Sequence, residues 1–228
     1  MFWNEEENPD EIQVPDDIVD LLFAIDCKRI PVDHAHLLSS ALQAALPWIA
    51  DEPGMALHTI HVAGSQNGWE RPTHGTDSEL ILSRRTKLTI RAPRTRIDDI
   101  LAQLPGIRLE LDGHPLTVGV GKIKPLCKDA TLFSRYVVTG NDARDEQEFL
   151  EIAVRALSGM GVQVRKALCG KTTALATPDG PLQTRSLMLA SLTAEESIQL
   201  QQTGLGSHRL MGCGIFIPHK GIDSVKHG

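Results

Sequence analysis

The sequence predicts an α+β fold built from two tandem ferredoxin-like halves, each with the element order β-α-β-β-α-β. The length of 228 residues suits two domains of about 100 residues each. An apolar content of 41% allows each half to bury a core. After residue 125 the order of strand and helix patterns begins again, although no residue-level repeat is visible. A single continuous mixed α+β sheet is the alternative.

The first half opens with a buried strand over residues 18–26, an apolar run bounded by charge. A helix follows in the segment IPVDHAHLLSSALQAALPW, with Asp33 as its N-cap and Pro47 as its end. One stripe of this helix is apolar and consists of Leu37, Leu38, Ala41, Leu42 and Ala45. Alternation and turn residues predict the other elements of this half: a strand over 54–64, a polar loop over 65–79, strand segments over 80–85 and 87–93 that form one hairpin or one bulged strand, a helix over 95–106, and a hairpin over 107–123 that turns at Asp112-Gly113.

The second half repeats this order. Its first helix carries acids in the first turn, and its second helix begins with a capping box from Thr193 to Glu196. The predicted elements are a strand over 131–140, a helix over 145–161, a strand over 162–168, a loop over 169–184, a strand over 185–192, a helix over 193–203 and a last strand over 213–218.

We therefore expect an N-terminal ferredoxin-like domain at 17–125 and a C-terminal one at 126–228, preceded by an acidic, mobile leader at 1–16. The net charge is −6, but the first twenty residues hold eight acidic and no basic side chains. The remaining chain has 23 basic and 21 acidic residues and is nearly neutral. A nucleic-acid partner must therefore rest on local basic patches.

The composition favours neither a membrane protein nor a metalloprotein. No window of about 18 apolar residues exists, and the acidic N-terminus is not a secretory signal. The four cysteines are scattered without metal-ligand spacing, so we expect reduced thiols in a cytoplasmic protein. His58 and His61 lie three apart on one predicted strand and should face opposite sides. We expect no metal site and no cofactor.

A glycine-dense segment, GLGSHRLMGCG, occupies residues 204–214 between the last predicted helix and the last strand. This order is the reverse of a dinucleotide-binding loop, which follows a strand and opens a helix. The segment CGKTTAL at 169–175 lacks the upstream glycine of a P-loop. Two interpretations of residues 204–214 remain. The glycines either make a tight helix-to-strand connection, or they let the backbone of a long ligand lie against the main chain.

The pattern Gly-Leu-Gly, five residues, Gly-Cys-Gly before the last strand resembles the glycine-rich signature of the CRISPR repeat-processing endoribonucleases of the RAMP superfamily. The segment IPVDHAHLLSSAL also looks like the first helix of that family, in particular of its subgroup from myxobacteria-like CRISPR loci. The resemblance implies a protein that binds a CRISPR repeat hairpin in precursor RNA and cuts it once without a metal. The products implied are a 2′,3′-cyclic phosphate and a 5′-hydroxyl. Members often hand their product to a CRISPR effector complex, whose subunits are further expected partners.

The resemblance also implies a catalytic histidine on or near the first helix. His34 and His36 open that helix, where the N-terminus favours neutral imidazole and attracts phosphate. His208, inside the glycine-rich segment, is a third candidate for proton transfer or phosphate contact. Some relatives carry histidine about two turns into this helix, where this chain has serines, so the choice among the three stays open.

Basic and glycine residues supply the expected RNA contacts. Residues 83–96 hold six basic side chains in fourteen, and residues 164–171 add three more. The predicted phosphate contacts are Arg84, Arg85, Arg165, Lys166, Lys171 and Arg209, and the predicted backbone contacts are Gly204, Gly206, Gly212 and Gly214. Tyr136 either stacks on a base or packs in the core.

Two other functions remain open. In the first alternative, the chain is a non-catalytic RNA-binding subunit of the same superfamily, in which the histidines are structural. In the second, it is an unrelated ferredoxin-like small-molecule or interaction domain. The basic patches disfavour the latter, whereas the acidic total favours it.

Overall fold

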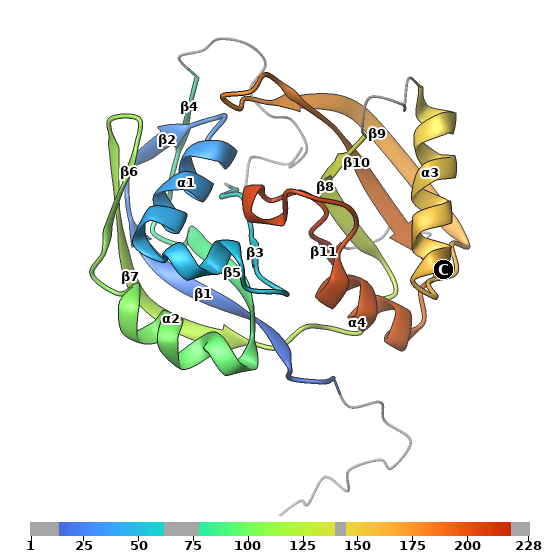
Figure 1. Cartoon of the computed structure of the whole chain (residues 1–228), viewed down its shortest axis with the longest axis horizontal. Helices are drawn as coiled ribbons and strands as arrows, with labels where there is room; N and C mark the ends of the chain where they lie inside the picture. Colours follow the sequence, from blue (N-terminus) through green and yellow to red (C-terminus); the bar gives the residue numbers. More distant parts are fainter. Residues whose placement is uncertain (1–13, 62–77, 140–144, 220–228) are drawn as a thin grey trace, which may run out of the picture.

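Two antiparallel sheets stand side by side in the computed structural model, which describes residues 14–61, 78–139 and 145–219 (Figure 1). The first sheet has the strand order β3-β5-β1-β7-β6, and the second has the order β11-β8-β10-β9. The first strand of each half lies between two later strands of the same half: β1 lies between β5 and β7, and β8 lies between β10 and β11. All registered pairs are antiparallel. This arrangement confirms the prediction of two ferredoxin-like halves and rules out the single continuous sheet.

The strands of the first sheet are β1 (Ile18–Asp26), β3 (Ala56–Leu57), β5 (Lys87–Pro93), β6 (Arg108–Leu111) and β7 (His114–Lys124). Those of the second are β8 (Leu132–Val138), β9 (Lys166–Leu175), β10 (Leu182–Ala190) and β11 (Ile217–Pro218). The helices are α1 (Ala35–Ala45), α2 (Ile97–Gln103), α3 (Glu146–Gly159) and α4 (Ala194–Thr203), with short 3₁₀ turns η1 (Pro47–Ala50), η2 (Arg94–Arg96) and η3 (Arg209–Met211).

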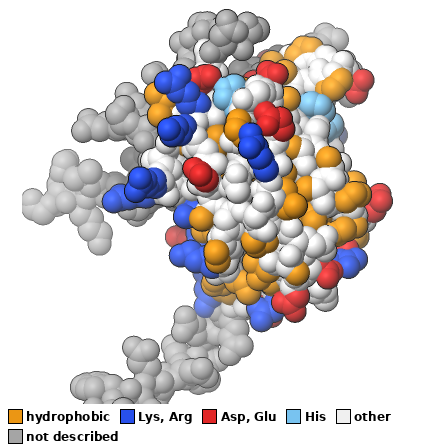
Figure 2. Space-filling model, turned by 90° about the vertical axis from the view of Figure 1, so that its left-hand side faces the viewer, with side chains coloured by type: hydrophobic (Ala, Val, Ile, Leu, Met, Phe, Trp, Pro, Cys, Tyr) orange, Lys and Arg blue, Asp and Glu red, His pale blue; other side chains and the backbone are white. Residues whose placement is uncertain are grey.

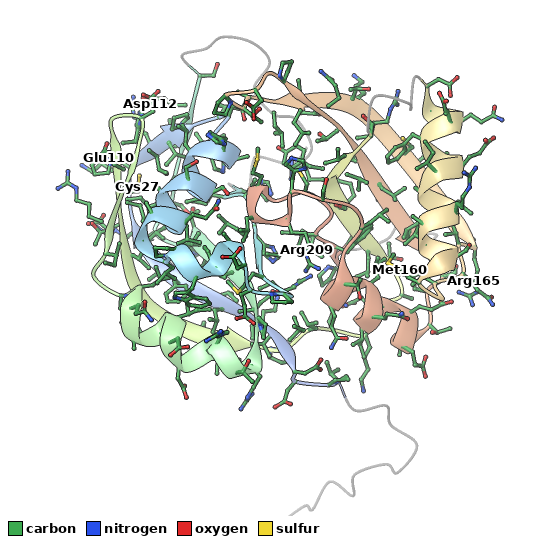
Figure 3. All side chains as sticks on the ribbon, viewed as in Figure 1. Cys27, Glu110, Asp112, Met160, Arg165 and Arg209 are labelled. Carbon is green, nitrogen blue, oxygen red and sulfur yellow. The ribbon has the colours of Figure 1, made fainter. Side chains whose placement is uncertain are left out.

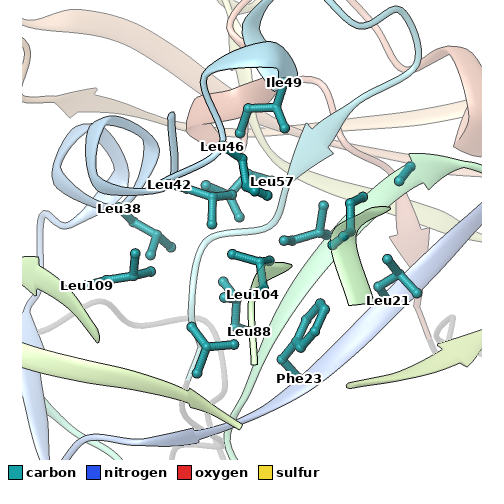
Figure 4. Packing of buried hydrophobic residues seen from close by; sticks show 14 of the residues in the cluster. Leu21, Phe23, Leu38, Leu42, Leu46, Ile49, Leu57, Leu88, Leu104 and Leu109 are labelled. Carbon is teal, nitrogen blue, oxygen red and sulfur yellow. The ribbon is translucent and has the colours of Figure 1, made fainter. Parts of the chain in front are cut away.

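The core of the first half lies between its sheet and the helices α1 and α2 (Figure 4). Alternate residues of β1, Leu21 and Phe23, point into it, and Leu38 and Leu42 arrive from one face of α1. Each such fully buried side chain contributes about 1.5–3 kcal/mol relative to an exposed one. The apolar stripe of the sequence therefore decides which face of α1 meets the sheet.

One predicted turn and one predicted helix cap are confirmed. Asp112 and Gly113 both have positive φ, 50° and 80°, as the two-residue turn between β6 and β7 requires. Thr193 and Glu196 form the predicted capping box at the start of α4.

Several predicted elements differ in extent or pairing from the structure. The predicted loop over 169–184 is mostly the hairpin of β9 and β10, because the turn residues around Pro178 to Gly180 bend only a short connection. Within the described part of the strand predicted over 54–64, residues 54–61, the β-pairing covers Ala56–Leu57, and β11 is two residues long. The hairpin or bulged strand predicted from residues 80–85 and 87–93 is wrong, because β4 (Glu79–Ile81) pairs with β2 (Arg29–Pro31) in a separate ribbon, whereas β5 pairs with β1.

Several predictions fall outside the described residues or are not tested by them. Residues 1–13 of the acidic leader, the loop over 65–77 and the ends of the strands predicted over 54–64 and 131–140 lie in undescribed segments. The domain boundary at residue 125 falls between β7 and β8 and stays a prediction. Within the described ranges, no helix combines the length and apolar character needed to cross a membrane.

Candidate active site

The start of α1 lies at the junction of the two halves. Its first residue, Ala35, packs with Tyr136, Leu175 and Cys213 of the second half. Tyr136 is therefore a core residue in this structure, buried among these neighbours. The prediction of Asp33 as the N-cap is wrong, since the N-cap is His34, without a side-chain cap hydrogen bond. Asp33 instead accepts a hydrogen bond from the Ala176 amide, at 2.8 Å, because its carboxylate reaches across to the second half.

His34 is 3% exposed and bonded at both ring nitrogens. Its Nδ1 lies 2.9 Å from the carbonyl oxygen of Pro31, and its Nε2 lies 2.9 Å from the Ile60 amide nitrogen. The imidazole thus joins the end of β2, the start of α1 and the segment that follows β3. The catalytic role of His34 stays a prediction.

His36 and His208 are more accessible to solvent. His36, the second residue of α1, is half-buried, and its only hydrogen bond among the described residues joins Nε2 to Ser40 Oγ at 3.3 Å. His208 is exposed and lies at the start of η3, with Nδ1 2.8 Å from Ser207 Oγ. Because η3 packs against α1, the tertiary structure brings the two elements that carry these histidines together (Figure 1).

The glycine-rich segment closes on itself and on the first half. The Leu205 amide donates to the Gly214 carbonyl at 3.0 Å, and a Cβ on Gly214 would lie 2.0 Å from the Leu205 carbonyl oxygen. A Cβ on Gly204 would meet the same Gly214 carbonyl, and one on Gly212 would meet Thr59. Leu210 packs against the core of the first half. The tight-connection interpretation therefore accounts for Gly204, Gly212 and Gly214.

Gly206 differs from these three glycines and allows a matched test. Its φ is +81°, but a Cβ there would meet nothing within 4 Å. We expect Gly206→Ala to lower the free energy of unfolding by about 1–2 kcal/mol, the cost of the left-handed backbone alone. Gly214→Ala, at φ +64°, should cost about 1–3 kcal/mol more, because its methyl group overlaps a backbone carbonyl. Urea denaturation of both variants checks this, and equal losses would contradict it.

Two residues predicted to contact phosphate, Arg209 and Arg165, are bound to other groups of the protein (Figure 3). Arg209 donates from both terminal nitrogens to the carbonyl oxygens of Thr203 and Gln202, so it caps the C-terminus of α4. Burial lowers the pKa of Arg209 to about 10. Arg165 lies far from it, at the outer side of the second half, and is paired with Glu196 at 2.6 Å. That ion pair lowers the pKa of Glu196 to about 2.

The other predicted contacts are unevenly placed. Arg84 and Arg85 are exposed in the turn between β4 and β5, and Lys166 and Lys171 are exposed on β9, the edge strand of the second sheet. Figure 2 shows that basic side chains follow one edge of the first half. Of these four, Arg85 lines a cavity that also contains residues of the second half.

That cavity is a cleft of about 330 Å³ between the two sheets. Lys87 and Thr89 of β5 line it because they alternate with the buried Leu88 and Ile90. From the second half, Arg135 of β8 enters with its Nε buried and without a hydrogen-bond partner among the described residues. The described lining contains no acidic residue; it consists of His58, Thr59, His61, Ser83, Arg85, Thr86, Lys87, Thr89, Arg135, Gly212, Ile215 and Ile217.

The prediction that His58 and His61 face opposite sides is wrong, and His58 belongs to a buried network of polar side chains. Both histidines line the same cleft, because β3 ends at Leu57 and period-two alternation does not continue to His61, although the His58 amide still donates to the Thr89 carbonyl oxygen at 3.0 Å. His58 Nε2 lies 3.4 Å from the Asp20 carboxylate. Burial lowers the pKa of His58 despite this negative charge.

Arg91 connects this network to the second half. It is fully buried, binds both oxygens of Asp20 at 2.8 and 3.0 Å, and donates to the carbonyl oxygens of Gln201 and Phe216. Burial raises the pKa of Asp20, but the opposing effects of His58 and Arg91 outweigh it and hold that pKa well below its usual range. One side chain of the first sheet thus fixes the end of α4 and the start of the last strand.

Sequence reasoning missed Arg91, Asp20 and Arg135, although each is a charged residue inside a mainly apolar strand. That pattern is the signal that could have found them, because such a charge must be paired or face a ligand. The four cysteines are free thiols. Among the described residues, no group of three or more histidine, cysteine or acidic side chains is placed to hold a metal ion.

Together these features define a protein with two ferredoxin-like halves and a basic cleft between its sheets. The family model for Cas6, described as "Cas6 Crispr", matches residues 19–221. The "CRISPR-associated endonuclease Cas6" of Myxococcus xanthus (strain DK1622) is 33% identical over 200 residues, which cover 88% of this chain and 81% of the relative. The chain belongs to the Cas6 family.

Two solved structures share the fold. One, "CRISPR associated protein Cas6", has a TM-score of 0.58 and 12% identity, over 89% of this chain and all of the other. A second, from work on a Cas6-related gene of Pyrococcus furiosus, has a TM-score of 0.58 and 17% identity, over 90% of this chain and 99% of the other. At this identity the likeness concerns the fold alone.

Proposed function

We propose that this protein is a metal-independent endoribonuclease that binds a CRISPR repeat hairpin in precursor RNA and cuts it once. The observation that carries the proposal is membership of the Cas6 family, together with a curated relative named as an endonuclease. The packing of α1, which carries His36, against η3, whose N-cap is His208, supports it, as does the basic cleft that Gly212 lines just after η3. We also infer a cytoplasmic location and contact with subunits of a CRISPR effector complex, both from the family resemblance.

The proposed chemistry is attack of the 2′-hydroxyl on the neighbouring phosphorus, with release of the 5′ oxygen. It needs a base at the 2′ proton, an acid at the leaving oxygen and donors for the phosphorane. We assign the base role to His36 and the acid role to His208. The first-turn amides of α1, which no side chain caps, are donors for the phosphate. The products are a 2′,3′-cyclic phosphate and a 5′-hydroxyl.

We infer the remaining RNA contacts from the solvent exposure of the basic side chains. Arg84, Arg85, Lys166 and Lys171 are available for stem phosphates. Gly206 has open space for an RNA backbone, whereas Arg209 and Arg165 must first release α4 and Glu196. Sequence-specific contacts to bases are few in this proposal, since Tyr136 is buried.

Incubation with a labelled CRISPR repeat RNA in excess EDTA tests the proposal. We expect a single cut that survives EDTA and leaves a cyclic phosphate. A 2′-deoxy nucleotide before the cut site should abolish cleavage and leave binding intact, because the nucleophile is then missing. Binding without a cut indicates the non-catalytic subunit, and loss of cleavage in EDTA contradicts metal independence.

A further inference from the structure

We propose that His34 is a positioning residue that holds the cleft-lining segment 58–61 against the first turn of α1, and that it transfers no proton itself. The inference rests on the proposed cleavage function, which it deepens by separating His34 from the proton-transfer histidines. In this proposal His34 connects two parts of the site, the start of α1 and the cleft between the sheets.

The hydrogen bonds of His34 fix its tautomer. The Ile60 amide can only donate, so the Nε2 atom 2.9 Å away must carry the lone pair. The proton then resides on Nδ1, which donates to the carbonyl oxygen of Pro31 at 2.9 Å. In this state the ring has no free lone pair for a substrate proton. Taking up a proton at Nε2 would place two N–H groups against each other and release Ile60.

The segment held by His34 faces the cleft on its other side. Ile60 is buried in the core of the first half, and the residues around it, His58, Thr59 and His61, line the cleft. Thr59 also meets Gly212 of the glycine-rich segment. His34 therefore sets the position of this segment relative to both α1 and the glycine-rich segment. A shift of about 1 Å in such a support is enough to lower a rate roughly 100-fold.

Two conservative variants of His34 test its two hydrogen bonds separately. The amide oxygen of His34→Gln can occupy the place of Nε2 and accept from Ile60, whereas the amide nitrogen of His34→Asn can replace only the Nδ1 donor. Neither side chain takes up or gives a proton near neutral pH. We expect His34→Ala and His34→Asn to slow single-turnover cleavage about 10- to 100-fold and His34→Gln to recover most of that loss. The pH–rate profile should keep both limbs in every variant.

A proton-transfer role gives the opposite pattern. His34→Gln would then be as slow as His34→Ala, one limb of the pH–rate profile would disappear, and added imidazole would restore His34→Ala. Any of these results overturns the proposal. His36→Ala, assayed in parallel, is the control that should lose a limb.

A second measurement does not depend on cleavage. Hydrogen exchange of the Ile60 amide should be slow in the unmodified protein and in His34→Gln, and fast in His34→Asn. Fast exchange in the unmodified protein would overturn the positioning role even if the RNA is cut. Slow exchange with no cut in any repeat RNA would mean that the proposed nuclease function fails while the His34 contact stands.

Discussion

Replacing Arg91 with methionine should lower the free energy of unfolding by about 3–5 kcal/mol, because the variant leaves Asp20 ionised, buried and without its guanidinium partner. The carbonyl oxygens of Gln201 and Phe216 lose their donor at the same time. Denaturation in guanidinium chloride measures the loss. Since these carbonyls belong to the second half, the variant should also loosen the junction between the halves.

Arg94→Met is the matched control for this prediction. Arg94 follows β5 directly and pairs with Asp16 at 3.1 Å, but both side chains are exposed, at 54% and 71%. Exposed pairs of this kind contribute about 0–1 kcal/mol. A loss for Arg91→Met no larger than that for Arg94→Met would contradict a structural role of the buried network.

The pH dependence of the Arg91 effect has a definite sign. The pKa of Asp20 is lower in the folded protein than in the unfolded chain, so its ionised form stabilises the fold above the unfolded value of about 3.9. That contribution is lost as the pH falls below this value. The difference in stability between the unmodified protein and Arg91→Met should therefore shrink in acid.

His36→Ala should reduce the single-turnover rate of RNA cleavage by about 10²- to 10⁴-fold, the usual loss when a general base is removed. Binding of a 2′-deoxy repeat RNA should change little, because His36 contributes a proton-transfer group rather than the main phosphate contacts. A pH–rate profile with its acid limb removed would identify the base. His208→Ala should remove the opposite limb and lower the rate over a similar range.

His114→Ala is the control for these two variants. His114, the first residue of β7, also carries an imidazole on the surface of the first half. It pairs with Glu79 of β4 at 2.8 Å and is not among the residues that line the cleft. Its removal should leave the rate within about threefold, well under the 1.4 kcal/mol of a tenfold change. If His36→Ala and His114→Ala cleave alike, His36 is not the base.

Local patterns in the sequence predict much of this fold. The stripe of Leu38 and Leu42 predicts the buried face of α1, and Asp112-Gly113 predicts the hairpin turn. The capping box at Thr193 predicts the start of α4. These signals hold because the interacting atoms lie within a few residues of each other, so the rest of the fold has little influence on them.

The candidate site depends on contacts that the sequence does not display. Arg91 and Asp20 are 71 residues apart, and His34 meets Ile60 across 26 residues. The sequence predicts a phosphate contact for Arg209, yet its guanidinium caps α4, and Gly204 and Gly214 close their own loop. The sequence by itself determined the order of elements, the family resemblance and the histidines worth testing. Only the tertiary structure decided which polar groups are paired, because burial removes water and makes each such group depend on a partner brought from elsewhere in the chain.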